Sequence, residues 1–263
     1  MKKIIASLLA LTLALSMAAC VDNANDGNTD TAADTAVDTA VDTAEDTTAD
    51  TAADTEPVDE VKVMTYAEYD AAELDAEVVI EAYVQAKQSW WDNKATIYTQ
   101  DQDGAYFIYE MTCTEEDYEK LVPGTKIRVT GFKTAWEGEV EIASGATFEI
   151  IEGDTYVAEP VDLTDKLGTE ELISYQNQLA LFKGMTVEAV EFKNGTPGDD
   201  IYVTLSKDGA SYDFCVEYYL TGTDTDVYKA VSELSAGDVV DVEGFVYWYQ
   251  GVNPHITAVS AAE

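Results

Sequence analysis

Aromatic side chains gather in three short stretches, and their type and spacing suit the binding of a ligand. These stretches contain, in chain order, Trp90 and Trp91, then Trp136, and then Tyr247, Trp248 and Tyr249. Flat aromatic faces stack on sugars or bases, and each stacked base contributes about 1–3 kcal/mol in nucleic-acid complexes. Tryptophan and tyrosine also commonly fill buried joints between modules or close the ends of barrels. The sequence therefore predicts either a ligand-binding site or a structural joint at these six residues.

Residue patterns typical of catalysis are missing from the sequence. His255 is the only histidine, and no HExxH, GxSxG or P-loop motif is present. A hydrolase built on paired carboxylates is the alternative, because Asp and Glu are abundant, although a small barrel domain offers little cleft for one. We therefore expect a protein that is not an enzyme and that needs no cofactor.

Neither a metal site nor a redox motif is predicted. Asp101, Asp103 and Gly104 look like part of a calcium loop, but no Glu closes the loop at the spacing of an EF-hand, and turn chemistry explains these residues more simply. Cys113 and Cys215 lie far apart and without CxxC spacing. They either form a disulfide or remain two separate buried thiols.

The net charge restricts the class of ligand. The chain has 52 Asp and Glu against 14 Lys and Arg, which gives a formal net charge of −38. Such a surface repels nucleic acid and anionic lipid headgroups, and it suits cations, basic peptides or neutral ligands. A nucleic-acid site would need a basic stripe on one face, and only Lys87 and Lys94, near Trp90, hint at one. Nucleic acid is therefore an unlikely partner.

The beginning of the chain has the features of an export signal. Two lysines precede a charge-free stretch from Ile4 to Ala19, which is shorter than the roughly 20 residues that a membrane-spanning helix needs. The run Ser16-Met-Ala-Ala-Cys20 resembles the lipobox of bacterial lipoproteins, with Met17 where leucine is usual. The resemblance implies that residues 1–19 are a signal peptide and that Cys20 carries a diacylglycerol. We therefore expect a palmitate-bearing lipid anchor at the extracytoplasmic face of the cell membrane.

An acidic repeat follows the expected anchor. From Asp30 the chain repeats an Asp-Thr-Ala unit, and residues 21–60 contain no Lys, Arg or aromatic residue. Such a segment cannot bury a core, and its like charges favour extension. Residues 20–60 are therefore predicted to form a disordered linker, whose threonines are candidates for O-glycosylation.

The rest of the chain contains one pattern twice. The first copy reads Leu121-x-x-Gly-x-x-Ile-x-Val-x-Gly-Phe132 and continues to Trp136 and Gly138. The second copy reads Leu234-x-x-Gly-x-x-Val-x-Val-x-Gly-Phe245 and continues to Tyr249 and Gly251. Identical spacing without a gap indicates a tandem repeat. It predicts two modules, at residues 61–155 and 170–263, joined by a linker at 156–169.

Each module shows the same order of elements. Alternation of apolar residues and turn signals between them predict three strands, a short helix and two further strands. In the first module these elements are expected at residues 77–88, 95–99, 105–111, 114–121, 126–134 and 139–150. In the second they are expected at residues 185–193, 201–205, 212–216, 225–234, 239–247 and 255–259.

This order is that of the OB-fold, a five-stranded Greek-key barrel with one helix between strands three and four. The fold class is therefore all-β, with two tandem OB-fold barrels. The Leu-x-x-Gly-x-x-Val-x-Val-x-Gly-Phe run resembles the fourth-strand entry of bacterial OB modules. The stretch from Met64 through Trp91 to Gly131 is similar to the tandem OB-like surface lipoproteins of Gram-positive gut bacteria, a resemblance that implies a fold and a location but no activity.

Together these features predict a surface lipoprotein that acts as a binding or adaptor module. A glycan, a cell-envelope component or a partner protein is the expected ligand. OB barrels bind ligands on the face of strands two and three, between the loops that join strands one to two and four to five, and the aromatic stretches fall in those loops. A structural spacer, in which the aromatics only join the barrels, is the alternative.

Overall fold

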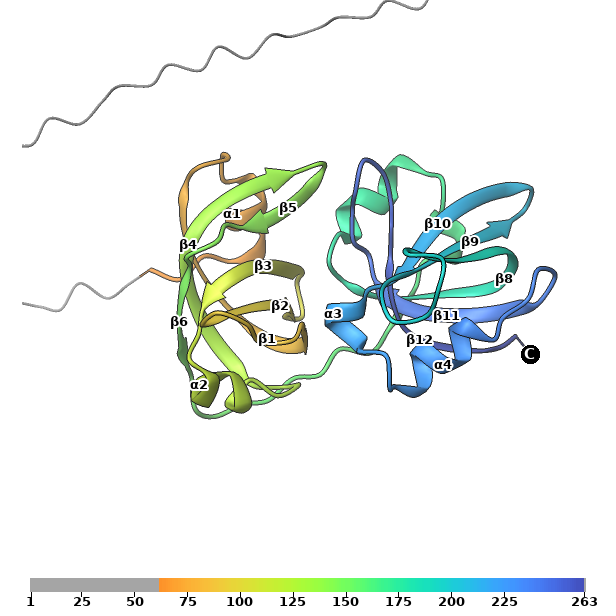
Figure 1. Ribbon diagram of the computed structural model, residues 1–263. Helices are drawn as coiled ribbons and strands as arrows, with labels where there is room; N and C mark the ends of the chain where they lie inside the picture. The colour runs from red at the N-terminus through yellow and green to blue at the C-terminus, as the bar shows by residue number, and fades with distance from the viewer. Residues whose placement is uncertain (1–61, 263) are drawn as a thin grey trace, which may run out of the picture. The chain divides into compact units, whose positions relative to one another are not determined.

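The computed structural model describes residues 62–262, and it folds these residues into two barrels (Figure 1). The predicted signal peptide, Cys20 and the acidic repeat all lie outside the described residues. No helix within residues 62–262 is long and apolar enough to cross a membrane.

The first barrel has the strand order of an OB-fold. Its elements are β1 (Glu77–Lys87), β2 (Lys94–Gln100), β3 (Ala105–Thr112), α2 (Glu115–Lys120), β4 (Lys126–Trp136), β5 (Glu139–Ile142) and β6 (Thr147–Ile150). The strands follow the order β1-β2-β3-β5-β4, and β4 pairs with β1 to close the barrel. All pairs are antiparallel except β3 with β5, which is parallel. The predicted helix and its capping residue are confirmed, since the Thr114 side chain accepts the Asp117 amide.

The fifth strand of the first barrel is split, where the sequence predicted one strand over residues 139–150. β5 pairs with the end of β4, β6 pairs with its beginning, and residues 143–146 turn between them. The break lies beside Gly131, where an added Cβ would stand 2.6 Å from the Ile142 side chain and 2.8 Å from that of Ala146. The turn therefore packs the side chains of Ile142 and Ala146 against Gly131, which has no side chain of its own.

The second barrel repeats the same topology. Its elements are β8 (Leu179–Phe192), β9 (Ile201–Lys207), β10 (Ala210–Val216), α3 (Tyr218–Thr221), α4 (Asp226–Ser232), β11 (Val239–Phe245) and β12 (His255–Ala261). The order β8-β9-β10-β12-β11 closes through β11 and β8, and β10 and β12 are again parallel. The predicted tandem of OB-folds is confirmed. The short helix α3, which directly follows β10, was not predicted.

Residues 156–169, predicted as a linker, are built into both barrels. The Ala158 amide donates to Oε1 of Gln85 on β1, while β7 (Val161–Asp162) pairs with β8. Two short 3-10 helices follow, η1 (Thr164–Lys166) and η2 (Glu170–Tyr175). Leu163 and Leu167 belong to the core of the second barrel, so the burial of apolar side chains holds this segment in place.

One further helix, α1 (Tyr66–Ala71), precedes the first barrel and was not predicted. Thr65 and Glu68 form a capping box at its start. At its end, the ammonium group of Lys133 donates to the carbonyls of Tyr69, Asp70 and Ala72 at 2.8–2.9 Å. A cation at this end satisfies carbonyl groups that have no partner within the helix.

The repeated glycines are explained by the fold. Gly124 and Gly237 have φ values of +90° and +98°, a conformation that glycine adopts without strain. Gly244 lies opposite Ile256 of the antiparallel neighbour β12, at a shift in register, and a Cβ there would stand 2.3 Å from the carbonyl oxygen of His255. The glycines of the shared pattern are therefore required by the backbone geometry of each barrel, and they contribute no chemistry of their own.

The replacement Gly244→Ala is expected to destabilise the second barrel by about 1–3 kcal/mol, because the new methyl group must displace backbone atoms. Thermal unfolding of the full chain followed by circular dichroism measures the effect. The neighbouring replacement Glu243→Ala is the control and is expected to change the unfolding midpoint little. Equal midpoints for the two variants would contradict the proposed packing at Gly244.

Candidate functional site at the interface of the two barrels

An aromatic stack joins the two barrels. The rings of Tyr98, on β2, and Phe245, on β11, are stacked with centroids 4.2 Å apart and planes inclined by 7°. Phe107 packs against the same tyrosine, and the Tyr98 hydroxyl lies 2.9 Å from Nδ1 of His255. All four side chains are buried. Stacking and burial together determine which face of each barrel meets the other.

The two barrels use an equivalent phenylalanine differently. Strand alternation directs Val129 and Val242 into the barrel interiors, so Phe132 and Phe245 point outward. Phe132 is 56% exposed, whereas Phe245 is only 3% exposed. Tyr98 of the first barrel stacks on Phe245, whereas no aromatic ring within residues 62–262 packs against Phe132. One copy of the repeated residue is therefore a joint, and the other is an open surface position.

Hydrogen bonds between the barrels lie around this stack. They run from the Trp248 amide to Oε2 of Glu139 (2.9 Å), from the Ser89 amide to the Tyr219 carbonyl (2.7 Å) and from Nε2 of Gln88 to Oε2 of Glu217 (3.1 Å). In the first barrel the bonded atoms belong to a loop or to the end of a strand. In the second barrel they belong to segments that follow β10 or β11. The barrels are thus held together at several points beyond the aromatic stack.

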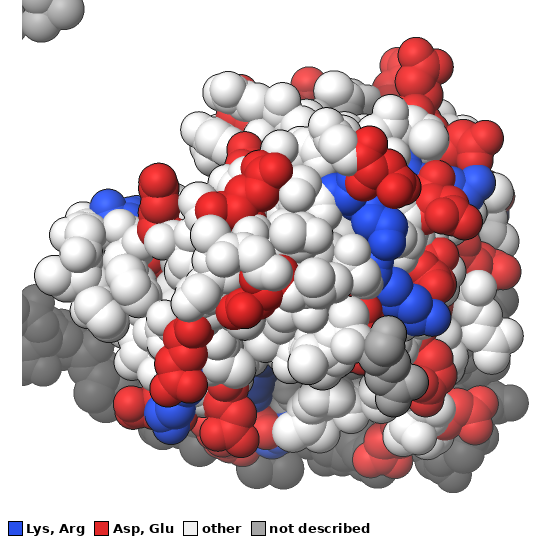
Figure 2. All heavy atoms as spheres, turned by 90° about the vertical axis from the view of Figure 1, so that its right-hand side faces the viewer, with Lys and Arg blue, Asp and Glu red and all other residues white. Residues whose placement is uncertain are grey.

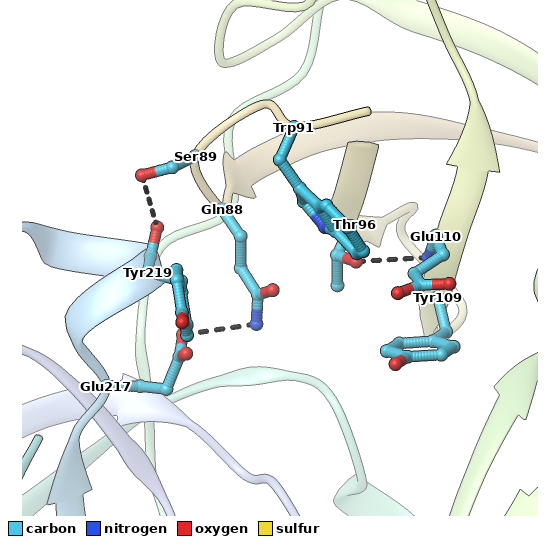
Figure 3. Close-up of a pocket in the computed structure, with 8 residues that line it drawn as sticks. All are labelled: Gln88, Ser89, Trp91, Thr96, Tyr109, Glu110, Glu217 and Tyr219. Carbon is cyan, nitrogen blue, oxygen red and sulfur yellow. Dashed lines mark hydrogen bonds between the residues drawn. The ribbon is translucent and has the colours of Figure 1, made fainter. Parts of the chain in front are cut away.

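Two adjoining cavities, of about 540 and 500 Å³, lie between the barrels. Gln88, Tyr109 and Glu217 border both cavities, and we call the two neighbouring cavities together the interbarrel groove. Figure 3 shows the smaller cavity, with Glu217 and Tyr219 on one side and Trp91 and Tyr109 on the other. Cavities of this size accommodate small ligands or parts of larger ones.

The first barrel contributes to the groove with the face that OB-folds use for ligands. Thr96 comes from β2, and Phe107 and Tyr109 come from β3. The opposite wall includes Tyr202 from β9 and Cys215 from β10, the corresponding strands of the second barrel. The two ligand faces therefore meet, partly in the aromatic stack and partly across the groove.

Four of the six predicted aromatic residues border the groove. They are Trp91, Trp136, Tyr247 and Tyr249. The Trp136 and Tyr249 rings lie 5.2 Å apart between centroids, and the Trp136 side chain is 52% exposed. Trp91 is also exposed, whereas Tyr247 is half-buried and stacks on His255 at 4.2 Å. The structure brings these residues together, and their contact with a ligand stays a prediction.

The other two predicted residues do not border the groove. Nε1 of Trp90 donates to the Cys113 carbonyl at 2.9 Å. The indole of Trp248 lies against Gly138, where an added Cβ would stand 2.6 Å from it. Both side chains are half-buried. Their positions are those of structural residues, at the end of the first barrel and between the barrels respectively.

Acidic residues in the groove were not singled out from the sequence. Glu110 and Glu141 come from the first barrel, and Asp200 and Glu217 come from the second. Glu139 and Glu141 lie two positions apart on β5, so they share its outer face. That alternation is visible in the sequence, but it does not reveal that the second barrel covers this face.

Glu141 is the most unusual of these residues. It is 7% exposed, and its carboxyl group makes no hydrogen bond or ion pair with any residue of the range 62–262. By contrast, Glu110 pairs with Lys94 at 2.9 Å, and Asp200 pairs with Lys193 at 2.9 Å. An ionised carboxyl group without such a partner loses solvation that nothing in the fold replaces.

Burial changes the protonation of the groove. It raises the pKa of Glu141 to about 7. It also raises the pKa of Glu217 to about 7, with a further contribution from the charge of Asp200. For His255, burial instead lowers the pKa to about 3, so its imidazole is neutral at pH 7. The groove therefore contains acids that are easily protonated and a histidine that supplies no positive charge.

The two cysteines of the described range are free and buried. Burial raises the pKa of the Cys113 thiol to about 11 and raises that of Cys215 as well. Of the two alternatives left open by the sequence, the structure has separate thiols. Neither is activated as a nucleophile, because the thiolate is the reactive form.

No group of three or more His, Cys, Asp or Glu residues within residues 62–262 is placed to hold a metal ion. Asp101, considered from the sequence as part of a calcium loop, instead accepts the amides of Asp103 and Gly104 at 2.7 and 2.8 Å. Its role in this part of the chain is that of a turn residue.

No protein-family model and no curated protein matches the sequence. Among solved structures, the chain is similar to a murine DNA-binding protein bound with double-stranded DNA, with a TM-score of 0.36 and 11% identity over 70% of this chain and 96% of the other. It is also similar to p202 HIN1 in complex with 12-mer double-stranded DNA, with a TM-score of 0.33 and 12% identity over 72% and 91%. A third similarity is to asparaginyl-tRNA synthetase from Pyrococcus horikoshii, with a TM-score of 0.26 and 16% identity over 32% of this chain and 18% of that one. At these scores, the strand order described above remains the basis of the fold assignment.

The stability of the barrels is expected to fall as the pH rises from about 4.5 to about 8. Burial raises the pKa of Glu139 to about 8, and one of its oxygens has no hydrogen-bond partner among the described residues. The folded state therefore keeps a proton that the unfolded chain releases at its ordinary pKa of 4.5. The stabilisation is fully present below that pKa, decreases as the pH rises and is lost once the pH has passed about 8. Glu141 and Glu217 act in the same direction near pH 7.

The replacement Glu139→Gln tests this expectation, because the amide stays neutral at every pH. It is expected to reduce the pH dependence of the free energy of unfolding by at most about 1.4 kcal/mol per pH unit. Urea unfolding of the full chain at pH 6, 7.5 and 9 measures it. The exposed residue Glu170 provides the control, Glu170→Gln, and an equal change in both variants would refute the role of Glu139.

Proposed function

We propose that the chain is an exported lipoprotein, anchored through Cys20 at the extracytoplasmic face of the membrane, and that its two-barrel part is a non-catalytic binding module. The interbarrel groove is the proposed ligand site. One observation carries this proposal: exposed aromatic rings border the same groove as a buried carboxyl group that has no hydrogen-bond or ion-pair partner among residues 62–262. The ligand is neutral or cationic, as in a glycan, a cell-envelope peptide or a basic segment of a partner protein.

The exposed rings support binding over a purely structural role. Trp136 and Tyr249 pack against each other while half of each side chain remains in solvent. Rings that serve only to join modules are normally buried, as Tyr98 and Phe245 are. Concave sites lined by aromatic rings and a few polar groups are typical of ligand pockets. A purely structural role is favoured only for the rings of the aromatic stack and for Trp90 and Trp248. A structural role for these rings is compatible with ligand binding by the others.

The charge of the groove argues against nucleic acid. None of the residues that border the two cavities is Lys or Arg, and phosphate contacts depend on such residues. Figure 2 displays one face of the molecule, where a short band of basic side chains is bordered by Asp and Glu. Such a band lacks the uninterrupted positive potential that a phosphate backbone requires.

A carboxylate hydrolase is the second candidate, because Glu141 and Glu217 border one groove. Hydrolases of this kind separate the pKa values of the two carboxyl groups, so that one donates a proton while the other is ionised. Here burial raises both pKa values to about 7. Two groups shifted alike are poorly suited to these opposite roles, and binding is the better-supported function.

Binding at the groove predicts that Trp136→Ala weakens ligand affinity about tenfold or more, because a stacking surface is removed. Isothermal titration calorimetry of the full chain with chitotetraose, a neutral glycan, and with acetyl-trilysine amide, a cationic peptide, measures it. Phe132→Ala is the matched control, since Phe132 lies on the same strand and is equally exposed but is outside the groove. Chitotetraose should be recovered intact from the mixture, whereas its cleavage would favour the hydrolase.

The binding proposal also predicts ligand-dependent protection of tryptophan fluorescence from acrylamide. Trp91 and Trp136 are the exposed tryptophans, so they should account for most of the quenching. Failure of both probes to bind or to alter quenching would leave the structural spacer as the remaining function.

The proposed anchor predicts that Cys20→Ala abolishes incorporation of radiolabelled palmitate and releases the chain from the membrane fraction. Acyl chains contribute about 0.8 kcal/mol for each buried methylene group, and the other two cysteines are buried thiols. Labelling of cells that express each form measures this, with Cys113→Ala as the control. Palmitate incorporation that persists in the Cys20 variant would contradict the anchor.

A further inference from the structure

Every charged side chain that borders the interbarrel groove is acidic. Glu110, Glu141, Asp200 and Glu217 reach it from both barrels. Figure 3 shows two of them on opposite sides, with Glu217 near Gln88 and Glu110 beside Tyr109. An enclosed space lined by one sign of charge concentrates the opposite sign.

Internal cations neutralise only half of this set. Lys94 pairs with Glu110, and Lys193 pairs with Asp200. Glu217 accepts only the neutral amide of Gln88 among the side-chain donors, and Glu141 has no partner in the part of the chain that the structure describes. Two groove carboxyl groups, one from each barrel, are therefore left without a positive charge.

His255 does not fill this gap, although it borders the groove too. Its Nδ1 atom is engaged with the Tyr98 hydroxyl at 2.9 Å, and burial lowers its pKa to about 3. The imidazole is thus neutral when Glu141 is ionised. Among the described residues, no cation therefore pairs with Glu141 or Glu217, and an external cation competes only with a proton for these carboxyl groups.

Aromatic rings lie next to these carboxyl groups. Phe107 is the residue paired with Glu141 across β3 and β5, and Trp136, Tyr247 and Tyr249 border the same cavity. The face of an aromatic ring attracts a cation, and the attraction is larger where water is excluded. A ligand with a positive group on an apolar stem would use both features.

A bare metal ion fits the groove poorly. Calcium takes six to eight oxygen ligands at short distance, and the groove acids do not form a set of three that could hold a metal. Carboxyl groups that are spread along a groove instead suit an elongated cation.

We propose that the groove binds an aliphatic ammonium group, of the kind carried by a lysine side chain or a small diamine, with the ammonium at Glu141 and its methylene stem along Trp136 and Tyr249. This inference rests on the proposed binding function and specifies its ligand. Binding supplies the partner that Glu141 lacks and covers apolar surface that is otherwise exposed.

Calorimetry of the full chain with acetyl-trilysine amide, at 0.15 M and 0.5 M salt, tests the inference. The probe with acetylated ammonium groups has the same backbone without the charge, and it should bind at least about tenfold more weakly, because a charge-assisted hydrogen bond to Glu141 is lost. The higher salt concentration suppresses general attraction to the acidic surface and should leave this difference in place.

The variants locate the site. Glu141→Gln is expected to weaken acetyl-trilysine amide about tenfold, whereas Glu170→Gln, which removes an equal charge from an exposed position outside the groove, should change affinity less than twofold. Circular dichroism establishes that each variant is folded. Cadaverine distinguishes the source of the ammonium group: binding equal to that of the peptide indicates a small amine, and preference for the peptide indicates a lysine-containing segment.

Equal affinity for the charged and acetylated peptides, or equal loss in the Glu141 and Glu170 variants, would overturn the inference. Chitotetraose separates this failure from that of the proposed function. If chitotetraose binds in a manner that requires Trp136 while the peptide does not, the groove is a binding site for neutral ligands. If no probe binds, both the inference and the proposed function fail.

Discussion

The contact between Tyr98 and Phe245 is the constraint on which the arrangement of the site depends. Both side chains point outward from their own barrels, and each would expose a large apolar ring if its barrel stood alone. Stacking at 4.2 Å buries both rings almost completely, and burial of aromatic surface is among the larger stabilising contributions available to small domains. Because Tyr98 lies on β2, this contact directs the outer face of β2 and β3 toward the second barrel. The groove exists because the stack covers only part of that face.

The same contact determines the electrostatics next to it. Covering β5 with the second barrel removes Glu139 and Glu141 from water, and burial then raises the pKa of both carboxyl groups. The Trp248 amide donates a hydrogen bond to Glu139, which partly replaces the solvation that this carboxyl group loses on burial. Glu141 instead borders the cavity. Burial keeps His255 neutral for the same physical reason with the opposite sign of charge. The apolar contact between the barrels lies beside a cavity. Burial there favours carboxyl groups that are either protonated or paired with an external cation.

The sequence predicted the barrels well because local patterns determine them. Alternating apolar residues fixed the strands of both modules, and the shared glycines marked positions where backbones approach closely, as at Gly244 and His255. The limits of the prediction have equally specific causes. The break between β5 and β6 depends on packing against Gly131. Residues 156–169 were predicted to be a linker because they lie between the two copies of the repeat, but Leu163 and Leu167 pack into the core of the second barrel. The acidic groove was missed because Glu141 becomes buried only through contact with another module.

The strands that run parallel to the third strand of each barrel give the groove an acid and a neutral histidine. Phe107 pairs with Glu141 where β3 runs parallel to β5, and Cys215 pairs with His255 where β10 runs parallel to β12. Glu141 and His255 therefore both lie on the strand that runs parallel to the third strand of its barrel, and both border the same cavity. In the second barrel His255 serves the joint, since it is engaged with Tyr98. In the first barrel, Glu141 makes no hydrogen bond or ion pair with residues 62–262, so under the proposed function it is the one of these two residues that is left for a ligand.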